Sequence, residues 1–303
     1  MSDDNHSQDL SLDAIFSRLR KEKDGKRKDT CMPFKFLDSY TLEDRNIFFG
    51  REKEIEAIFR MLYSGKLILV YGKSGTGKSS IVNCGLLSRI PREDIFSINI
   101  RCGRKAHGNF ISGIKKFSGN GSGNSSSDAV EILEDIFFEQ SKPITLILDQ
   151  FEEIFVLSRK NERQKLVSDL SRILKSRLKI NIVLVIREEF FANLTEFEPD
   201  IPGLYDHRIR IERMSRSSAL KVITEPCKVC EVGIEDGLPE KVLDQLLGTS
   251  EGLELTWLQI LMDKLYRMAN ERDEEAPVIR HEDLEKLGRM GNVLSDFPDP
   301  RAL

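Results

Sequence analysis

The chain has 303 residues, of which 32% are charged and 40% are hydrophobic, and its formal net charge is −4. This is the composition of a globular protein of about two domains. The slightly acidic balance provides no overall positive field, so we do not expect a nucleic-acid partner. No apolar run approaches the ~20 residues that span a membrane, and the polar start is no secretory signal. Five irregularly spaced cysteines are typical of a reducing compartment, which predicts a cytoplasmic protein without a membrane partner.

Residues 1–32 are predicted to be a flexible tail that contains one short amphipathic helix. A charged, glycine-broken run at 20–28 follows that helix and is most simply a solvated linker. We expect the helix either to dock a partner chain or to pack on the protein's own core. Its apolar residues recur at helical spacing: Leu12, Ile15, Phe16 and Leu19.

The most informative motif is a glycine-rich octapeptide at 72–79, which lies between a strand-like run at 67–71 and a helical pattern at 81–90. Strand, glycine loop and helix together point backbone N–H groups and the positive end of a helix dipole at phosphates. Lys78 would reach the β- and γ-phosphates, and Ser79 would hold Mg²⁺. The sequence therefore predicts binding of ATP or ADP with Mg²⁺. The predicted phosphate-side residues are Gly72, Lys73, Ser74, Gly75, Thr76, Gly77, Lys78, Ser79 and Ser80.

Strand-like and helical runs alternate over the first folded domain, for which we expect residues 33–216. This alternation predicts an α/β fold with a doubly wound parallel sheet. The glycine- and serine-rich stretch at 118–127 is expected to be a surface loop. Beyond Ser217 we expect no strands and an all-helical lid subdomain over 217–275. The strand-like runs are 67–71, 95–100, 144–148, 182–186 and 208–211, and the helical ones include 130–138, 166–178, 219–230, 239–247 and 255–268.

A second acidic motif follows the third strand-like run. Asp149 stands at the end of that run, where a carboxylate can hold Mg²⁺ through its water shell. Glu152 or Glu153 would orient the attacking water, and we favour Glu153; the alternative for both is an acidic helix start. The run 95–100 lies between the glycine loop and Asp149. Together with a glutamate after the aspartate, this inserted strand indicates the additional-strand type of P-loop NTPase rather than a kinase or small GTPase.

Two further features have alternative interpretations. Arg187 follows the fourth strand-like run, where it would sense the γ-phosphate or, alternatively, form a surface pair with Glu188 or Glu189. Cys227 and Cys230 form a CxxC pair, but no second pair stands at zinc-site distance and the histidines are scattered. We therefore favour ordinary helix thiols over a metal or redox site.

Together these motifs resemble the STAND class of signal-transduction ATPases over about residues 34 to 290. The likeness is greatest to the bacterial novel STAND NTPase 1 type, which is related to the NACHT and NB-ARC signalling ATPases. The segment 40–54 resembles the opening of that family, which lies against the adenine, so Phe48, Phe49 and Arg51 are implied to be base-side residues. Thr256 departs from the class, because a nucleotide-contacting proline is expected in the lid at this position. The other matching segments are 148–155, 185–191, 223–226 and 255–259.

The resemblance implies a molecular switch that is closed with ADP at rest and oligomeric with ATP, with slow hydrolysis as a timer. In bacteria it implies a role in antiphage defence or signalling. The class couples its ATPase to an effector domain and a sensor array. Residues 276–303 would be either only the start of a winged-helix segment, near 278–287, or a C-terminal tail. We therefore expect either a fragment of a longer protein or an effector and sensor that act in trans.

Two alternatives stay open at this point. The same opening occurs in AAA+ initiator and loader ATPases that act on DNA, which usually carry a lid arginine and a basic module. Arg267 offers the arginine, but no basic module is found here. The other alternative is an ADP-binding regulatory module without useful turnover. Turnover with and without DNA, together with the nucleotide retained on purification, discriminates among the three.

Overall fold

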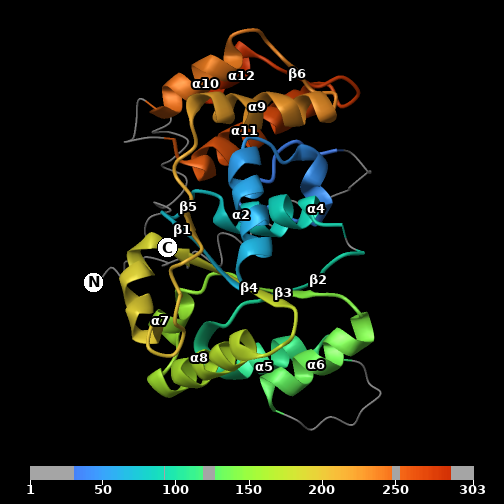
Figure 1. Ribbon diagram of the computed structural model, residues 1–303. Helices are drawn as coiled ribbons and strands as arrows, with labels where there is room; N and C mark the ends of the chain where they lie inside the picture. Colours follow the sequence, from blue (N-terminus) through green and yellow to red (C-terminus); the bar gives the residue numbers. More distant parts are fainter. Residues whose placement is uncertain (1–30, 92, 119–126, 248–252, 288–303) are drawn as a thin grey trace, which may run out of the picture. The chain divides into compact units, whose positions relative to one another are not determined.

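The computed structural model describes residues 31–91, 93–118, 127–247 and 253–287 (Figure 1). Residues 1–32 form a unit distinct from residues 33–303, and the second unit holds all the elements described below. The predicted N-terminal helix, most of the predicted loop at 118–127 and the end of the segment 276–303 lie outside the described residues. No helix among the described residues is long and apolar enough to cross a bilayer.

A five-stranded parallel sheet forms the centre of the first domain, in the order β2-β3-β4-β1-β5. All five predicted strands are present, which confirms the parallel α/β fold. The strand that lies between β1 and β3 is β4, so the predicted run 95–100 is an edge strand and not the inserted one. The strands are β1 (Leu67–Gly72), β2 (Phe96–Ile100), β3 (Ile144–Leu148), β4 (Ile180–Arg187) and β5 (Arg208–Arg210).

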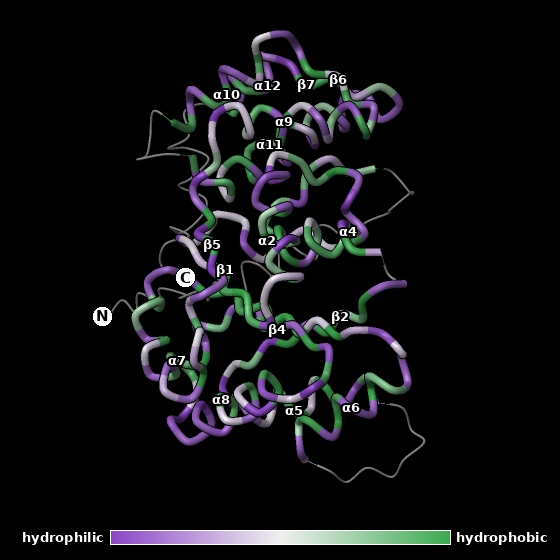
Figure 2. Tube along the Cα trace, in the orientation of Figure 1, coloured by the Kyte–Doolittle hydropathy of each residue, from purple (hydrophilic) through white to green (hydrophobic). Residues whose placement is uncertain are grey.

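Helices cover both faces of the sheet, because successive side chains of a buried strand point to opposite sides (Figure 1). Leu67 and Leu69 of β1 pack in the core with α5, α6 and α8, whereas Ile68 and Val70 pack with α2 and η2. The three central strands β1, β3 and β4 are therefore nearly continuous hydrophobic runs (Figure 2). These helices are α2 (Glu52–Ser64), η2 (Ile81–Leu86), α5 (Ala106–Lys115), α6 (Ala129–Gln140) and α8 (Lys160–Lys175).

The predicted helix after the glycine loop is continuous but not uniform. It begins as α3 (Lys78–Ser80), widens into the π-helical η2, and ends as α4 (Leu87–Arg89). Its Gly85 lies so close to α2 that a β-carbon there would approach the Ile55 side chain to 2.5 Å. The close packing of η2 on α2 fixes the helix that carries Lys78 and Ser79. The remaining short elements are η1 (Leu42–Ile47), η3 (Gly103–Lys105), α7 (Glu153–Leu157) and η4 (Glu188–Phe197).

The lid contains the three predicted helices, as α9 (Arg216–Val229), α10 (Leu238–Leu247) and α11 (Leu255–Arg272). The prediction that it has no strands was wrong. Two-residue strands, β6 (Gly233–Ile234) and β7 (Val278–Ile279), pair in parallel and are too short to produce a periodic pattern.

The lid core also extends past residue 275. Ile279 of β7 and Leu284 of α12 (His281–Leu287) belong to the same hydrophobic cluster as Cys227. Cys227 is a buried free thiol, as expected, whereas Cys230 is disulfide-bonded and does not match that expectation. In the described part of the chain, residues 276–287 therefore contribute to the lid core, and the division at residue 275 stays a prediction.

Candidate nucleotide-binding site

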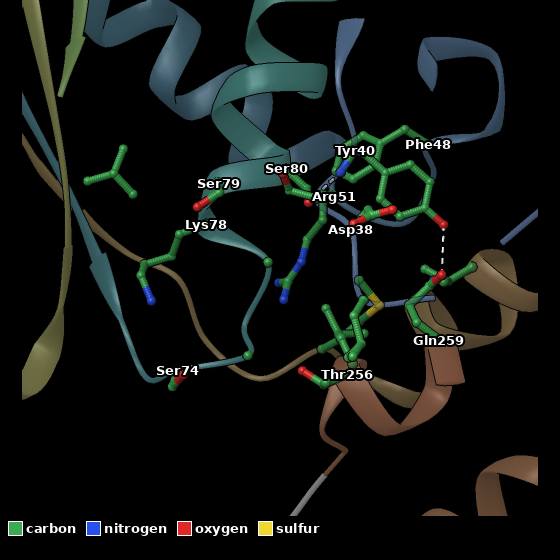
Figure 3. Close-up of a pocket in the computed structure, with 18 of the residues that line it drawn as sticks. Asp38, Tyr40, Phe48, Arg51, Ser74, Lys78, Ser79, Ser80, Thr256 and Gln259 are labelled. Carbon is green, nitrogen blue, oxygen red and sulfur yellow. Dashed lines mark hydrogen bonds between the residues drawn. The ribbon is translucent and has the colours of Figure 1, made fainter. Parts of the chain in front are cut away.

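A cavity of about 250 Å³ lies between the carboxyl ends of the sheet strands and the lid (Figure 3). Twelve of the predicted site residues line it, although they come from distant parts of the sequence. The others, Gly72, Lys73, Thr76 and Glu153, do not. The twelve are Phe48, Phe49, Arg51, Ser74, Gly75, Gly77, Lys78, Ser79, Ser80, Asp149, Glu152 and Arg187.

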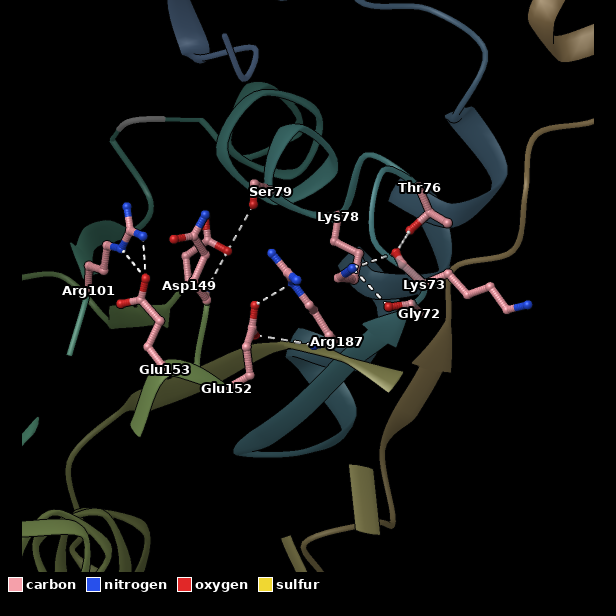
Figure 4. A network of polar contacts seen from close by, with 11 residues as sticks. Gly72, Lys73, Thr76, Lys78, Ser79, Arg101, Asp149, Glu152, Glu153 and Arg187 are labelled. Atoms are coloured by element: carbon pink, nitrogen blue, oxygen red, sulfur yellow. Dashed lines mark hydrogen bonds and ion pairs between the residues drawn. The ribbon is translucent and has the colours of Figure 1, made fainter. Parts of the chain in front are cut away.

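The glycine loop owes its shape to left-handed residues and internal hydrogen bonds. Gly75 and Gly77 have φ angles of 72° and 86°, which residues with a β-carbon rarely adopt. Lys78 Nζ donates to the carbonyls of Gly72 at 2.9 Å and Lys73 at 2.8 Å (Figure 4). Gly72 and Lys73 therefore support Lys78 through their backbone carbonyls and not through a side chain. Burial lowers the pKa of Lys78, and the nearby carboxylate of Glu152 opposes this shift.

Ser79 and Asp149 lie in contact, as their predicted roles in holding Mg²⁺ require. Ser79 Oγ donates to Asp149 Oδ1 at 3.0 Å, which joins the helix after the loop to the tip of β3. Two amides that no sequence motif indicated also belong to this site: Asn83 Nδ2 donates to Asp149 Oδ2 at 3.2 Å, and Asn99 Nδ2 donates to Asn83 Oδ1 at 2.6 Å. The signal for Asn83 was its position four residues after Ser79, on the same helix face. A hydroxyl and an oriented carboxylate fit Mg²⁺, which takes few protein ligands beside phosphate oxygens and waters.

The two glutamates after Asp149 lie in different surroundings. Glu152 is only 8% exposed and lines the cavity. Its Oε1 lies 3.1 Å from Arg187 Nε, and its Oε2 accepts from the Arg187 backbone N–H at 3.2 Å. Glu153 instead pairs with Arg101 at the end of β2, and this hydrogen bond raises the pKa of Arg101 (Figure 4).

The turn after β3 and the pairing of Arg187 explain this difference. Gln150 has a φ of 52°, an unfavourable conformation for a residue with a side chain, and its N–H donates to Asp149 Oδ1 at 2.9 Å. Glu188, one of the two alternative partners that the sequence allowed for Arg187, pairs with Arg210 at 3.0 Å. Arg187 therefore faces the cavity through its pair with Glu152.

At the other end of the cavity lies a segment that we call the entry segment, residues 33–51. Phe48 and Phe49 line the cavity there, and the ring centroids of Tyr40 and Phe48 are 5.4 Å apart. Arg51 is 3% exposed and donates to the carbonyls of Thr76 at 2.8 Å and Glu212 at 3.1 Å. Its guanidinium thus holds the glycine loop in place, and the base-side role that the resemblance implied stays a prediction.

The lid reaches the site through the first turns of α11. A β-carbon placed on Gly75 would lie 3.2 Å from Thr256 Oγ1, and one on Gly77 would lie 3.4 Å from the Leu255 side chain. Thr256 lines the cavity, although it departs from the expected proline. Gln259, one turn further along α11, also lines the cavity and was not singled out by the sequence.

The parallel sheet, the glycine loop at a helix N-terminus and the Ser79–Asp149 contact define a P-loop NTPase. The model of the Novel STAND NTPase 1 family matches residues 33–299, and the chain belongs to this family. No curated protein matches the chain.

Solved structures with a similar fold share little sequence with this chain. The Walker-type ATPase PABY2304 of Pyrococcus abyssi is 16% identical with a TM-score of 0.59, over 88% of this chain and 79% of that one. The Aeropyrum pernix ORC2 protein in ADPNP–ADP complexes is 14% identical with a TM-score of 0.58, over 82% and 69%. The Aeropyrum pernix ORC1 protein in complex with DNA is 15% identical with a TM-score of 0.51, over 84% and 70%. At these identities the likeness shows the fold alone.

Proposed function

We propose that this NTPase is an ATP-driven molecular switch that holds ADP at rest, hydrolyses ATP slowly and forms oligomers with ATP. The observation that carries the proposal is that the core and the lid line the same cavity. Lys78, Asp149 and Arg187 line it from the core, and Thr256 lines it from the lid. A γ-phosphate in this cavity would therefore act on the core and the lid together.

The chain's residues divide the chemistry between them. Bound Mg²⁺ would be held by Ser79 and Asp149 and would neutralise phosphate charge. Either Glu152 or Glu153 would orient the attacking water. The γ-phosphate would compete with Glu152 for Arg187, so this ion pair would report whether the phosphate is present. A nucleotide shifts such an equilibrium only by binding one arrangement more tightly than the other.

The biological setting that we propose is bacterial antiphage defence or signalling, in the cytoplasm. Support comes from membership of a STAND family, whose members the sequence resemblance links to such roles. The partners would be further copies of this chain and an effector or sensor protein, either in trans or in a longer form of the chain.

The proposal is tested by measuring whether the mass of the protein in solution depends on the bound nucleotide. Light scattering coupled to size exclusion should give a monomer or small dimer with ADP, and a larger species with Mg·ATP or with a hydrolysis-deficient variant held in ATP. Lys78→Ala is the matched control, since it should stay small in both nucleotides. Equal mass in ADP and in trapped ATP would refute the switch.

A DNA-acting ATPase is the second candidate, favoured by the fold likeness to the Aeropyrum pernix ORC1 protein solved with DNA. The net charge of −4 argues against it. Turnover that rises several-fold with duplex DNA would support this candidate, and an ADP-loaded protein with no turnover would support a purely regulatory module.

A further inference from the structure

A buried hydrogen bond connects the entry segment to the lid. The Tyr40 hydroxyl donates to Gln259 Oε1 at 3.0 Å, across 219 residues of sequence (Figure 3). The two residues are only 7% and 9% exposed. The backbone N–H of Lys35 donates to the same oxygen at 3.3 Å, so one lid oxygen accepts from two groups of the entry segment.

Tyr40 is also attached to the phosphate side of the cavity. Its backbone N–H donates to Ser80 Oγ at 3.1 Å, on the helix that follows the glycine loop. Its ring packs against Phe48, which lines the base-side end of the cavity. Tyr40 therefore contacts the phosphate-loop helix, the cavity wall and the lid helix α11 at once.

A single turn near the start of α11 contacts both ends of the cavity. Thr256 lies against Gly75 of the glycine loop, and Gln259, three residues later, holds the entry segment. If α11 moved away, the buried Tyr40 hydroxyl and the half-buried Lys35 N–H would lose their acceptor, and an unpaired buried donor such as this hydroxyl is costly. Burial also raises the pKa of Tyr40, so the hydroxyl remains a donor at neutral pH.

We propose that Tyr40 and Gln259 form a latch that holds α11 closed over the bound nucleotide and sets how long the nucleotide stays. Both are positioning residues, since they act through the lid. The inference rests on the proposed function in one respect, that this cavity binds a nucleotide. Because release requires the lid to open, losing the latch should speed dissociation more than association.

The test measures release of a fluorescent ADP analogue, chased with excess unlabelled ADP in a stopped-flow instrument. Tyr40→Phe removes only the hydroxyl and keeps the ring and the backbone bond to Ser80. We expect release to become about fivefold faster, which corresponds to about 1 kcal/mol. Gln259→Met removes the acceptor for both donors and should release faster still. Association rates should stay within about twofold of the original protein.

Tyr266→Phe is the matched control on the same helix. Its hydroxyl contacts Asn270 within α11 at 3.4 Å, so its loss should leave release unchanged. The double variant should release no faster than Gln259→Met alone, because both changes remove the same bond.

Three results would overturn the latch. These are unchanged release in both single variants, fold-changes that multiply in the double variant, or equal acceleration in the control. Melting temperatures check that each variant is folded, and Tyr40→Phe remains informative even if Gln259→Met unfolds. An original protein that binds no nucleotide would refute the proposed function itself, whereas nucleotide binding with unchanged release in the variants would refute only the latch.

Discussion

Replacing Glu152 and Glu153 separately by glutamine distinguishes the roles of two adjacent carboxylates. Glu152 lines the cavity beside Arg187, whereas Glu153 is held by Arg101, whose side chain is 65% exposed. Glutamine keeps the shape of the glutamate side chain and removes only its negative charge and its basicity. We expect Glu152→Gln to abolish most turnover and Glu153→Gln to have little effect.

The expected magnitudes follow from these surroundings. Losing a positioned general base costs ~10²-fold or more in rate, which is about 2.7 kcal/mol of barrier. Glu152→Gln also removes a negative charge near Lys78, so ATP affinity should be unchanged or tighter. For Glu153→Gln, the lost pair with an exposed arginine contributes about 0–1 kcal/mol to stability. Turnover in this variant should stay within about threefold of the original protein.

Phosphate release under single-turnover conditions gives the rates, and calorimetry with Mg·ATP gives the affinities. The reverse pattern, with Glu153→Gln slow and Glu152→Gln active, would refute this reasoning and would restore the assignment that the sequence favoured. Full turnover in both variants would place the base elsewhere.

Three further substitutions test the phosphate loop, the metal site and the contact of the entry segment with the lid. Lys78→Ala should weaken Mg·ATP binding at least about tenfold, because backbone amides cannot replace its charge, and unchanged affinity by calorimetry would contradict the site. Asn83→Ala should raise the Mg²⁺ concentration for half-maximal turnover by about 10-fold, since the Asn83 amide orients the Asp149 carboxylate, while binding of metal-free ADP stays the same. Gly50→Ala should destabilise more than Gly237→Ala in denaturant titrations, by about 1–2 kcal/mol. Both glycines have positive φ, but only at Gly50 would a β-carbon meet a backbone carbonyl, at 2.7 Å, so equal effects would contradict the packing.

The sequence by itself determined the local parts of this protein. The five strands, the three main lid helices and the phosphate loop each follow from patterns within a few residues, such as alternating runs and the glycines before Lys78. The pairing of Ser79 with Asp149 was also predictable, because each motif implies a Mg²⁺ ligand and a parallel sheet brings strand ends to one edge.

Only the tertiary structure decided the relations between those parts. It placed β4, and not the run 95–100, beside β1, and it set Glu152 rather than Glu153 on the cavity. In the tertiary structure Arg51 also donates a hydrogen bond to the glycine loop, and Tyr40 donates one to Gln259, which is 219 residues away in the sequence. Strand order and long-range hydrogen bonds depend on how separate elements pack. A one-residue step around a turn, such as the left-handed Gln150, changes which side chain faces the site and leaves no periodic trace in the sequence.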